Sequence, residues 1–576
     1  MKRRLFWLGA LILLLLGLML RFRPPFRLES PLFQGKNVLI LVPHQDDELN
    51  LAGTLLSRYV ENGSTVTVAF STNGDYNGLA ELRSREALAV ARELGIPRER
   101  VIYLGYGDQW QHQEQAGRLR KHLYFSADGD ALWTSHFGAT HTYGTGLIEP
   151  YAERDYTRTG FLQDLTDLIL ELRPDVIYCC DYDAHHDHMA LDLFFEEALA
   201  GILTREPGYR PTVYKGFCYG TAWYAEADVL GSENLRSSTK PVWDHWERLG
   251  ISYRWDDRVR LPVSDGDLSR LLSHTELYGA IRLHRSQNGH RFAESVLSGD
   301  KVFFQRRTDS LLYRAVFTAG GQTVTLWNDF KLKDSEDFSA LTNTGLAFGP
   351  EITVRLEAPA ELGEVWLYDD PDPANNILAG FLLFADGTRV EFGPLDPGGG
   401  ATVIPFQPQT VDGFTLCFTD TQGEPGLAEI EAYPGGTEEP IQLLMAMDES
   451  GDFVYDYWVD GDGTVDLRLY AYPAAVSWED ITVTTSGGFG CTTQLIGDTL
   501  RVTCPTGGRI RITLTSGRVQ TTFTVSNPTE LTRRIWMLLQ ELAAAAAHRL
   551  AEYLDQKAKS TTIDPSEPKG GTAHGR

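Results

Sequence analysis

The sequence is poor in cysteine and in positive charge, and each shortage argues against a class of protein. Only six of its 576 residues are cysteine, and none forms a C-x-x-C pair, so a structural zinc ribbon is not expected. Lysine and arginine number 52 against 78 acidic residues, which gives a formal net charge of −26. Because phosphate binding needs a basic stripe, nucleic acid is not expected as the main partner.

Two of the cysteines flank a predicted hairpin near the C-terminus. Cys491 and Cys504 would form a disulfide outside the cytosol. Two buried thiols are the alternative, and the sequence favours neither.

Long hydrophobic runs are also scarce, and the main one stands at the N-terminus. An apolar stretch from Leu5 to Leu20 lies between Lys2-Arg3-Arg4 and Arg21. No small-x-small cleavage site and no lipobox cysteine follows it. We therefore expect residues 1–35 to be an uncleaved membrane anchor with its spacer, and the bulk of the chain to lie outside the cytoplasm.

Strand and helix patterns alternate from residue 36 to about 205. Apolar strands are expected at 38–42, 64–72, 101–105 and 175–180, with helices between them. This alternation predicts an α/β, Rossmann-like domain with a parallel sheet, which later segments extend to residue 315. Two of the strands end in His/Asp clusters. The first cluster is residues 44–48 (HQDDE), after the strand at 38–42, and the second is residues 181–188 (DYDAHHDH), after the strand at 175–180. Such clusters meet at one edge of a parallel sheet, where ligands gather.

The remaining chain changes character. Short alternating strands with Gly, Pro and Asp turns predict two all-β sandwich domains, at 322–435 and 441–526. The first resembles discoidin-like or galactose-binding modules, which bind glycans, although a structural spacer explains it equally well. The second has the size of an immunoglobulin-like module. An amphipathic helix is expected at 529–557 and a disordered tail at 558–576.

The two clusters have the composition of a hydrolytic metal site. Such a zinc site takes three protein ligands from histidines and carboxylates and leaves a position for water. His44, Asp47 and His188 are able to supply these ligands. The alternative is that both clusters are solvated turns or helix caps.

Three further residues of the clusters suit the remaining roles of such a site. Asp46 is placed to take the proton of the water, and His185 to meet the oxyanion of the tetrahedral intermediate. Asp187 suits the task of holding an imidazole in one tautomer.

Four separated motifs resemble the LmbE-like, zinc-dependent N-acetylglucosaminyl de-N-acetylases, which include the GlcNAc-phosphatidylinositol deacetylase. In chain order they are Pro43-His44-Gln45-Asp46-Asp47-Glu48, the Arg83 to Glu86 pair before Leu94-Gly95, His185 to His188, and His284-Arg285-Ser286-Gln287. The resemblance covers residues 36 to about 310. It implies zinc on His44, Asp47 and His188, with Asp46 as general base and His185 as oxyanion stabiliser.

Two departures from the family pattern affect the expected site. Gln45 replaces the usual proline and is expected to loosen the loop, and His186 adds an imidazole beside the predicted ligands. Iron(II) suits the same ligand set as zinc.

Four other residues are candidates for supporting or substrate-binding roles. Arg83 and Glu86 lie one helical turn apart and either shape the pocket or form a surface ion pair. His284 is expected behind the ligands or facing substrate, and Asp75 is a candidate for the sugar site, with a polar turn as its alternative.

The sequence thus predicts a membrane-anchored, zinc-dependent deacetylase of an N-acetylglucosamine-type sugar in a glycan, glycolipid or cell-wall polymer. One alternative is an amidase that acts on another acylated amine. The other is a glycan-binding surface protein with a vestigial hydrolase domain. The oligomeric state is left open.

Overall fold

The computed structural model describes residues 25–538 with several gaps. The gaps are residues 109–129, 131–137, 182, 184, 219–252, 269–273, 288, 290–298, 326, 333–350, 371, 373, 424–425, 437–438, 460–461 and 475–476. The predicted anchor helix, most of the predicted 529–557 helix and the predicted tail lie outside the described residues; within them, residues 530–538 are helical. No helix in the described part of the chain is long and apolar enough to cross a membrane.

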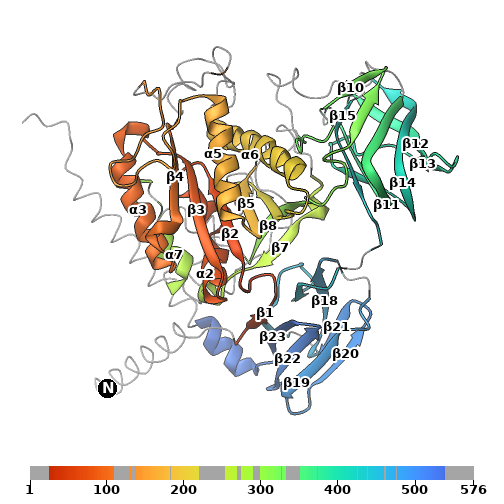
Figure 1. Ribbon diagram of the computed structural model, residues 1–576. Helices are drawn as coiled ribbons and strands as arrows, with labels where there is room; N and C mark the ends of the chain where they lie inside the picture. Colours follow the sequence, from red (N-terminus) through yellow and green to blue (C-terminus); the bar gives the residue numbers. More distant parts are fainter. Residues whose placement is uncertain are drawn as a thin grey trace, which may run out of the picture.

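The first domain is built on a seven-stranded sheet (Figure 1). Its order is β4-β3-β2-β5-β6-β8-β7, and the strands are β2 (Asn37–Val42), β3 (Thr65–Thr72), β4 (Val101–Tyr106), β5 (Val176–Cys180), β6 (Thr212–Gly216), β7 (Val259–Pro262) and β8 (Asp300–Arg306). The first five in this order are parallel. Strand β8 pairs antiparallel with both of its neighbours, β6 and β7, so the sheet is mixed and the prediction of a parallel sheet is wrong at this edge.

Helices alternate with the parallel strands, as the apolar periodicity predicts. They are α2 (Asp47–Glu61), α3 (Ala80–Glu93), α5 (Arg158–Leu172), α6 (His186–Arg205) and α7 (Glu276–Ile281). Helices α2, α3 and α7 pack together, and α5 packs on α6. The chain runs outward from β2 to β4 and then returns to β5 on the other side of β2. The order therefore reverses between β2 and β5, the point where open α/β sheets bind ligands.

The second region is one network of seven antiparallel strands. They are β9 (Val316–Ala319), β10 (Gln322–Val324), β11 (Glu351–Asp369), β12 (Asn376–Leu383), β13 (Arg389–Phe392), β14 (Ala401–Gln422) and β15 (Leu427–Tyr433). Its core is separate from that of the first domain. Register shifts in β11 at Arg355/Ala360 and Leu362/Glu364 interrupt its long ladder with β14.

The last region contains a four-stranded and a five-stranded sheet. The first has the order β16-β18-β21-β20, from β16 (Leu443–Met447), β18 (Thr464–Tyr472), β21 (Thr499–Thr503) and β20 (Thr492–Ile496). The second contains β1 (Arg27–Glu29), β17 (Asp456–Trp458), β19 (Thr482–Gly487), β22 (Arg509–Ser516) and β23 (Val519–Ser526). Strand β1 comes from the other end of the chain and pairs with β23.

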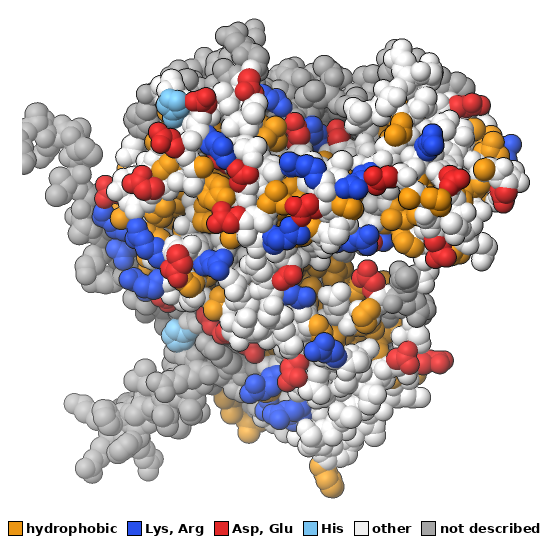
Figure 2. Space-filling view, in the orientation of Figure 1, with side chains coloured by type: hydrophobic (Ala, Val, Ile, Leu, Met, Phe, Trp, Pro, Cys, Tyr) orange, Lys and Arg blue, Asp and Glu red, His pale blue; other side chains and the backbone are white. Residues whose placement is uncertain are grey.

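Buried polar contacts join the three regions. Arg306 on β8 lies 3.4 Å from Glu431 on β15, and both side chains are at most 2% exposed. The hydroxyl of Tyr214 on β6 donates to that of Tyr472 on β18 at 3.1 Å. On the face drawn in Figure 2, basic and acidic side chains are interspersed, and no basic stripe crosses it.

Cys491 and Cys504 lie close together as free thiols. Their sulfur atoms are 3.1 and 2.9 Å from the position that a Cβ would take on Gly508. Burial and the neighbouring Cys491 thiol raise the pKa of Cys504 to about 12.

We expect mild oxidation to join these thiols and to stabilise the last region by about 2–3 kcal/mol, because the bond would close a short loop of the unfolded chain. Oxidation should be faster at alkaline pH, since the thiolate is the reacting form. Intact mass without reductant, together with urea unfolding, measures both effects, and Cys491→Ser is the control. An unchanged mass after oxidation would contradict the prediction.

Candidate active site

The first cluster occupies the turn between β2 and α2. Asp46 is the residue before the helix and has φ 126°, a backbone conformation that is strained for any residue but glycine. Glu48 accepts a hydrogen bond from the Asp46 N–H at 2.8 Å, and the Asp46 carbonyl accepts from Leu49 and Asn50. These contacts hold Asp46 at the mouth of the site. Its side chain is 24% exposed, whereas that of Asp47 is fully buried.

The second cluster opens α6 after β5. The Nδ1 atom of His185 accepts from the Asp187 backbone N–H at 3.2 Å and so caps the helix. In a neutral His185 the proton therefore sits on Nε2, which makes that atom a donor rather than a metal ligand. Asp183 lies 2.8 Å from Nδ1 of His188, which leaves Nε2 of His188 as the acceptor atom.

Three acceptor atoms from the two clusters converge. Asp47 Oδ2 lies 3.1 Å from both His44 Nδ1 and His188 Nε2. Behind His44, Asp187 Oδ2 is 3.0 Å from Nε2. Each imidazole thus has a carboxylate on its far nitrogen and faces Asp47 with the other, the arrangement that orients histidine ligands of metals. This donor set fits a divalent cation.

The electrostatics also fit a cation. Burial lowers the pKa of His44, but the carboxylates of Asp108, Asp187 and Asp47 outweigh it and raise this pKa to about 10. Asp183 and Asp47 likewise raise the pKa of buried His188 well above its usual value. The carboxylates around the two imidazoles therefore favour positive charge at this site, which a divalent cation would supply.

Asp46 has the opposite character. Burial and the Asp47 carboxylate raise its pKa to about 7, while Arg83 and His284 oppose the shift. A carboxyl that titrates near neutrality suits a residue that accepts and returns a proton.

The 284–287 segment closes the site from behind. His284 Nε2 is 2.7 Å from Glu48 Oε1, Ser286 donates twice to Glu86, and Gln287 Oε1 accepts from Arg83 at 2.6 Å. His284 is fully buried, with Glu48 between the imidazole and the turn that carries the predicted ligands. The surface ion pair considered for Arg83 and Glu86 is wrong, because both residues are buried and their side chains bind this segment.

Gln45 does not loosen the loop. Its side-chain amide donates to the Thr72 carbonyl at 3.1 Å, its backbone carbonyl accepts from the Arg83 guanidinium at 3.2 Å, and the residue is completely buried. The side-chain amide thus ties the turn to β3. The expectation that replacing proline by glutamine loosens this loop did not include such a hydrogen bond. Gly74 (φ 57°) makes room for it, since a Cβ there would lie 1.9 Å from Gln45 Oε1.

Asp75 supports the site wall. It accepts from the Asp108 N–H at 2.7 Å and from the Tyr143 hydroxyl at 2.5 Å. Asp108 in turn lies 3.8 Å from His44 Nε2 and 3.6 Å from Arg83.

Sequence reasoning missed three residues of the site. They are Asp108, Asp183 and Cys218. The sulfur atom of Cys218 lies within 4.8 Å of the potential ligand atoms of Asp47 and His188. Asp108 and Cys218 each follow a strand of the same sheet edge, β4 and β6, and Asp183 stands in the second cluster itself. Their position after strands was the available signal.

A buried His/Asp cation site beside a partly exposed carboxyl defines a hydrolase-type centre. Residues 39–199 match the family model described as PIG-L, GlcNAc-PI de-N-acetylase. This part of the chain is therefore a PIG-L (LmbE-like) deacetylase domain, and its fold is that of hydrolases acting on N-acetyl groups. Residues 340–433 match a domain of unknown function, and no curated protein matches the chain.

Several solved structures, deacetylases among them, match part of the chain. The N,N'-diacetylchitobiose deacetylase of Pyrococcus horikoshii is 16% identical over 47% of this chain and 84% of its own, with a TM-score of 0.27. A conserved protein of Thermus thermophilus is 16% identical over 47% of this chain and 94% of its own, with a TM-score of 0.27. The zinc-inhibited form of teicoplanin deacetylase is 14% identical over 47% of this chain and 98% of its own, with a TM-score of 0.25. At these values no substrate is carried over to this chain.

Proposed function

We propose that the protein is a zinc-dependent N-deacetylase that hydrolyses the acetamide of an N-acetylglucosamine-type sugar in a glycan, glycolipid or cell-wall polymer. The observation that carries this proposal is the convergence of His44, Asp47 and His188 beside Asp46. His44, Asp47 and His188 would hold the metal ion, which when bound polarises the amide carbonyl and lowers the pKa of a water molecule. Iron(II) suits the same ligands.

The chain's own groups supply the proton transfers. Asp46 takes a proton from the attacking water at its exposed carboxylate and returns it to the nitrogen of the leaving amine. His185 donates from Nε2 to the oxyanion, because its Nδ1 is occupied by the helix N–H. Asp183 and Asp187 keep the two ligand imidazoles in the tautomers that expose their lone pairs.

We further propose that the N-terminal apolar run anchors the protein and that its bulk lies outside the cytoplasm. Basic residues flank this run, and no other stretch of the chain is as apolar. This placement favours a surface glycan or glycolipid over a small cytosolic metabolite.

Release of acetate and free amine tests the function. The full chain, stripped with a chelator and reloaded with zinc or iron(II), is incubated with N-acetylglucosamine oligomers and with amines bearing longer acyl groups. Equal amounts of acetate and amine, dependent on metal, would support the proposal. Turnover of longer acyl amides alone would favour the amidase alternative. No turnover with one metal ion bound would favour a vestigial domain.

Removing Arg83 should shift the pH profile of this activity. Arg83 lies 3.8 Å from Asp46 and lowers its pKa, so Arg83→Gln raises that pKa and keeps Asp46 protonated to higher pH. We expect the acidic limb of kcat/KM to move up by about one pH unit. Arg83→Lys should restore the limb. Arg85→Gln, on the exposed face of the same helix, is the control; an unchanged limb in Arg83→Gln would contradict the prediction.

A further inference from the structure

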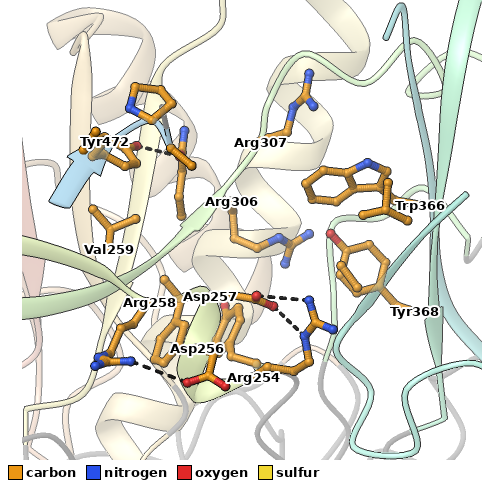
Figure 3. Close-up of a pocket in the computed structure, with 18 of the residues that line it drawn as sticks. Arg254, Asp256, Asp257, Arg258, Val259, Arg306, Arg307, Trp366, Tyr368 and Tyr472 are labelled. Carbon is orange, nitrogen blue, oxygen red and sulfur yellow. Dashed lines mark hydrogen bonds and ion pairs between the residues drawn. The ribbon is translucent and has the colours of Figure 1, made fainter. Parts of the chain in front are cut away.

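A groove lies where the three regions meet, away from the catalytic centre. Its first part is a cavity of about 480 Å³ between Tyr253–Val259 and Phe304–Arg307 of the first domain, Trp366 and Tyr368 of β11, and Tyr470–Ala474 of the last region (Figure 3). A second cavity of about 530 Å³ shares Arg254, Ala401 and Val403 with it. The two cavities adjoin at these shared residues, and together we call them the junction groove. Strands β6 and β8 separate its edge strand β7 from β5 and the active site.

Aromatic rings line much of this groove. Tyr253 stacks on Phe304 with ring centres 4.5 Å apart and an angle of 6°. Trp366 and Tyr368 lie beside Arg307 and Arg306 (Figure 3), whose guanidinium carbons are 5.4 Å from the ring centre of Trp366 and 5.7 Å from that of Tyr368. Flat apolar rings pair well with ligands that have a flat apolar face.

The charged groups of the groove are already neutralised. Each of its four arginines has a carboxylate partner: Arg254 with Asp257 at 2.8 Å, Arg258 with Asp256 at 3.9 Å, Arg306 with Glu431 at 3.4 Å and Arg307 with Glu364 at 2.8 Å. The groove therefore carries little net charge, and its exposed pairs, Arg254 with Asp257 and Arg307 with Glu364, offer hydrogen-bonding groups. This disfavours a strongly anionic ligand, as does the net charge of −26.

We propose that the junction groove binds a neutral saccharide chain. A sugar ring has a C–H face that packs on aromatic rings and a rim of hydroxyls that bond to guanidinium and carboxylate pairs. Two adjoining cavities of about 480 and 530 Å³ suit several consecutive units rather than one small ligand. The use of the junction groove as a second binding point for the substrate polymer rests on the proposed function. The binding of a saccharide chain in the groove does not.

Binding of a neutral N-acetylglucosamine hexamer to the zinc-loaded full chain, carrying Asp46→Asn to prevent turnover, tests the groove. Val403 is 42% exposed and pairs directly with Trp366 across β14 and β11, so Val403→Arg fills the groove from the surface. We expect Val403→Arg and Trp366→Ala each to weaken hexamer binding about 10- to 30-fold in calorimetry. Val316→Arg, at a 49% exposed position of β9 in the same region, should not.

The outcomes separate the two proposals. If the chain with Asp46 intact has no deacetylase activity and hexamer binding still depends on Val403, the proposed function is wrong and the groove proposal stands. Unchanged hexamer binding in both groove variants would overturn the groove, whatever the activity. Preferential binding of an anionic polymer such as polygalacturonate, strengthened by Val403→Arg, would overturn the neutral class of ligand.

Discussion

Asp46→Asn is expected to lower kcat about 10²- to 10⁴-fold while leaving the metal content unchanged. The amide cannot accept the proton of the attacking water, and the three acceptor atoms that would hold the metal belong to His44, Asp47 and His188. Asparagine tolerates a positive φ about as well as aspartate, so the strained turn should persist.

Initial rates of acetate release and metal analysis of the same sample measure this effect. Glu81→Gln, an equivalent change on the surface of α3, is the control and should leave kcat unaltered. A variant that retains both metal and activity would assign the base to another carboxylate of the site. Loss of the metal would instead make Asp46 a ligand.

Lys215→Met is expected to destabilise the folded protein by about 3–5 kcal/mol at neutral pH. Lys215 on β6 is fully buried against Asp192 and lies 3.5 Å from Glu196, both on α6. Removing the ammonium leaves two buried carboxylates with Arg306 as their remaining nearby cation, 3.7 Å from Glu196. Urea unfolding measures the loss, and Lys331→Met, at a less buried pair with Glu197, should cost less than about 1 kcal/mol.

The loss should also depend on pH. Burial and Glu196 raise the pKa of Asp192 well above its usual value, and Lys215 opposes them. In the variant the folded state therefore binds a proton more tightly than the unfolded state, so stability falls as pH rises through the folded pKa. We expect a smaller deficit near pH 5 than near pH 8. A deficit that grows on acidification would contradict this account.

The strand-helix alternation and the metal-type clusters were predictable from short-range patterns. Buried strands such as β2 have continuous apolar runs, and the reactive residues follow them directly in the chain. The order of strands then places the 43–48 and 183–188 segments together, because β2 and β5 are neighbours. Motif and topology thus agree for His44, Asp47 and His188.

Other features depend on contacts between distant segments. Asp183 and Asp187 both stand in the second cluster, but only the folded helix end decides which of them lies behind which imidazole. The role of the 284–287 segment depends on its partners Glu48, Arg83 and Glu86. The antiparallel pairing of β8 with β6 and β7 escaped prediction, because an apolar strand pattern reads the same in either direction and a helix, α7, precedes β8 just as a crossover helix would.

The pairing of β1 with β23 has a consequence for how the chain is made. Arg27 is opposite Thr522, and Phe26, beside this strand, packs on Tyr455 with ring centres 4.8 Å apart. During synthesis the first strand must wait for almost the whole protein before its partner exists. A chain interrupted before β23 lacks the strand with which β1 pairs. The final placement of the N-terminal segment is therefore coupled to the synthesis of β23.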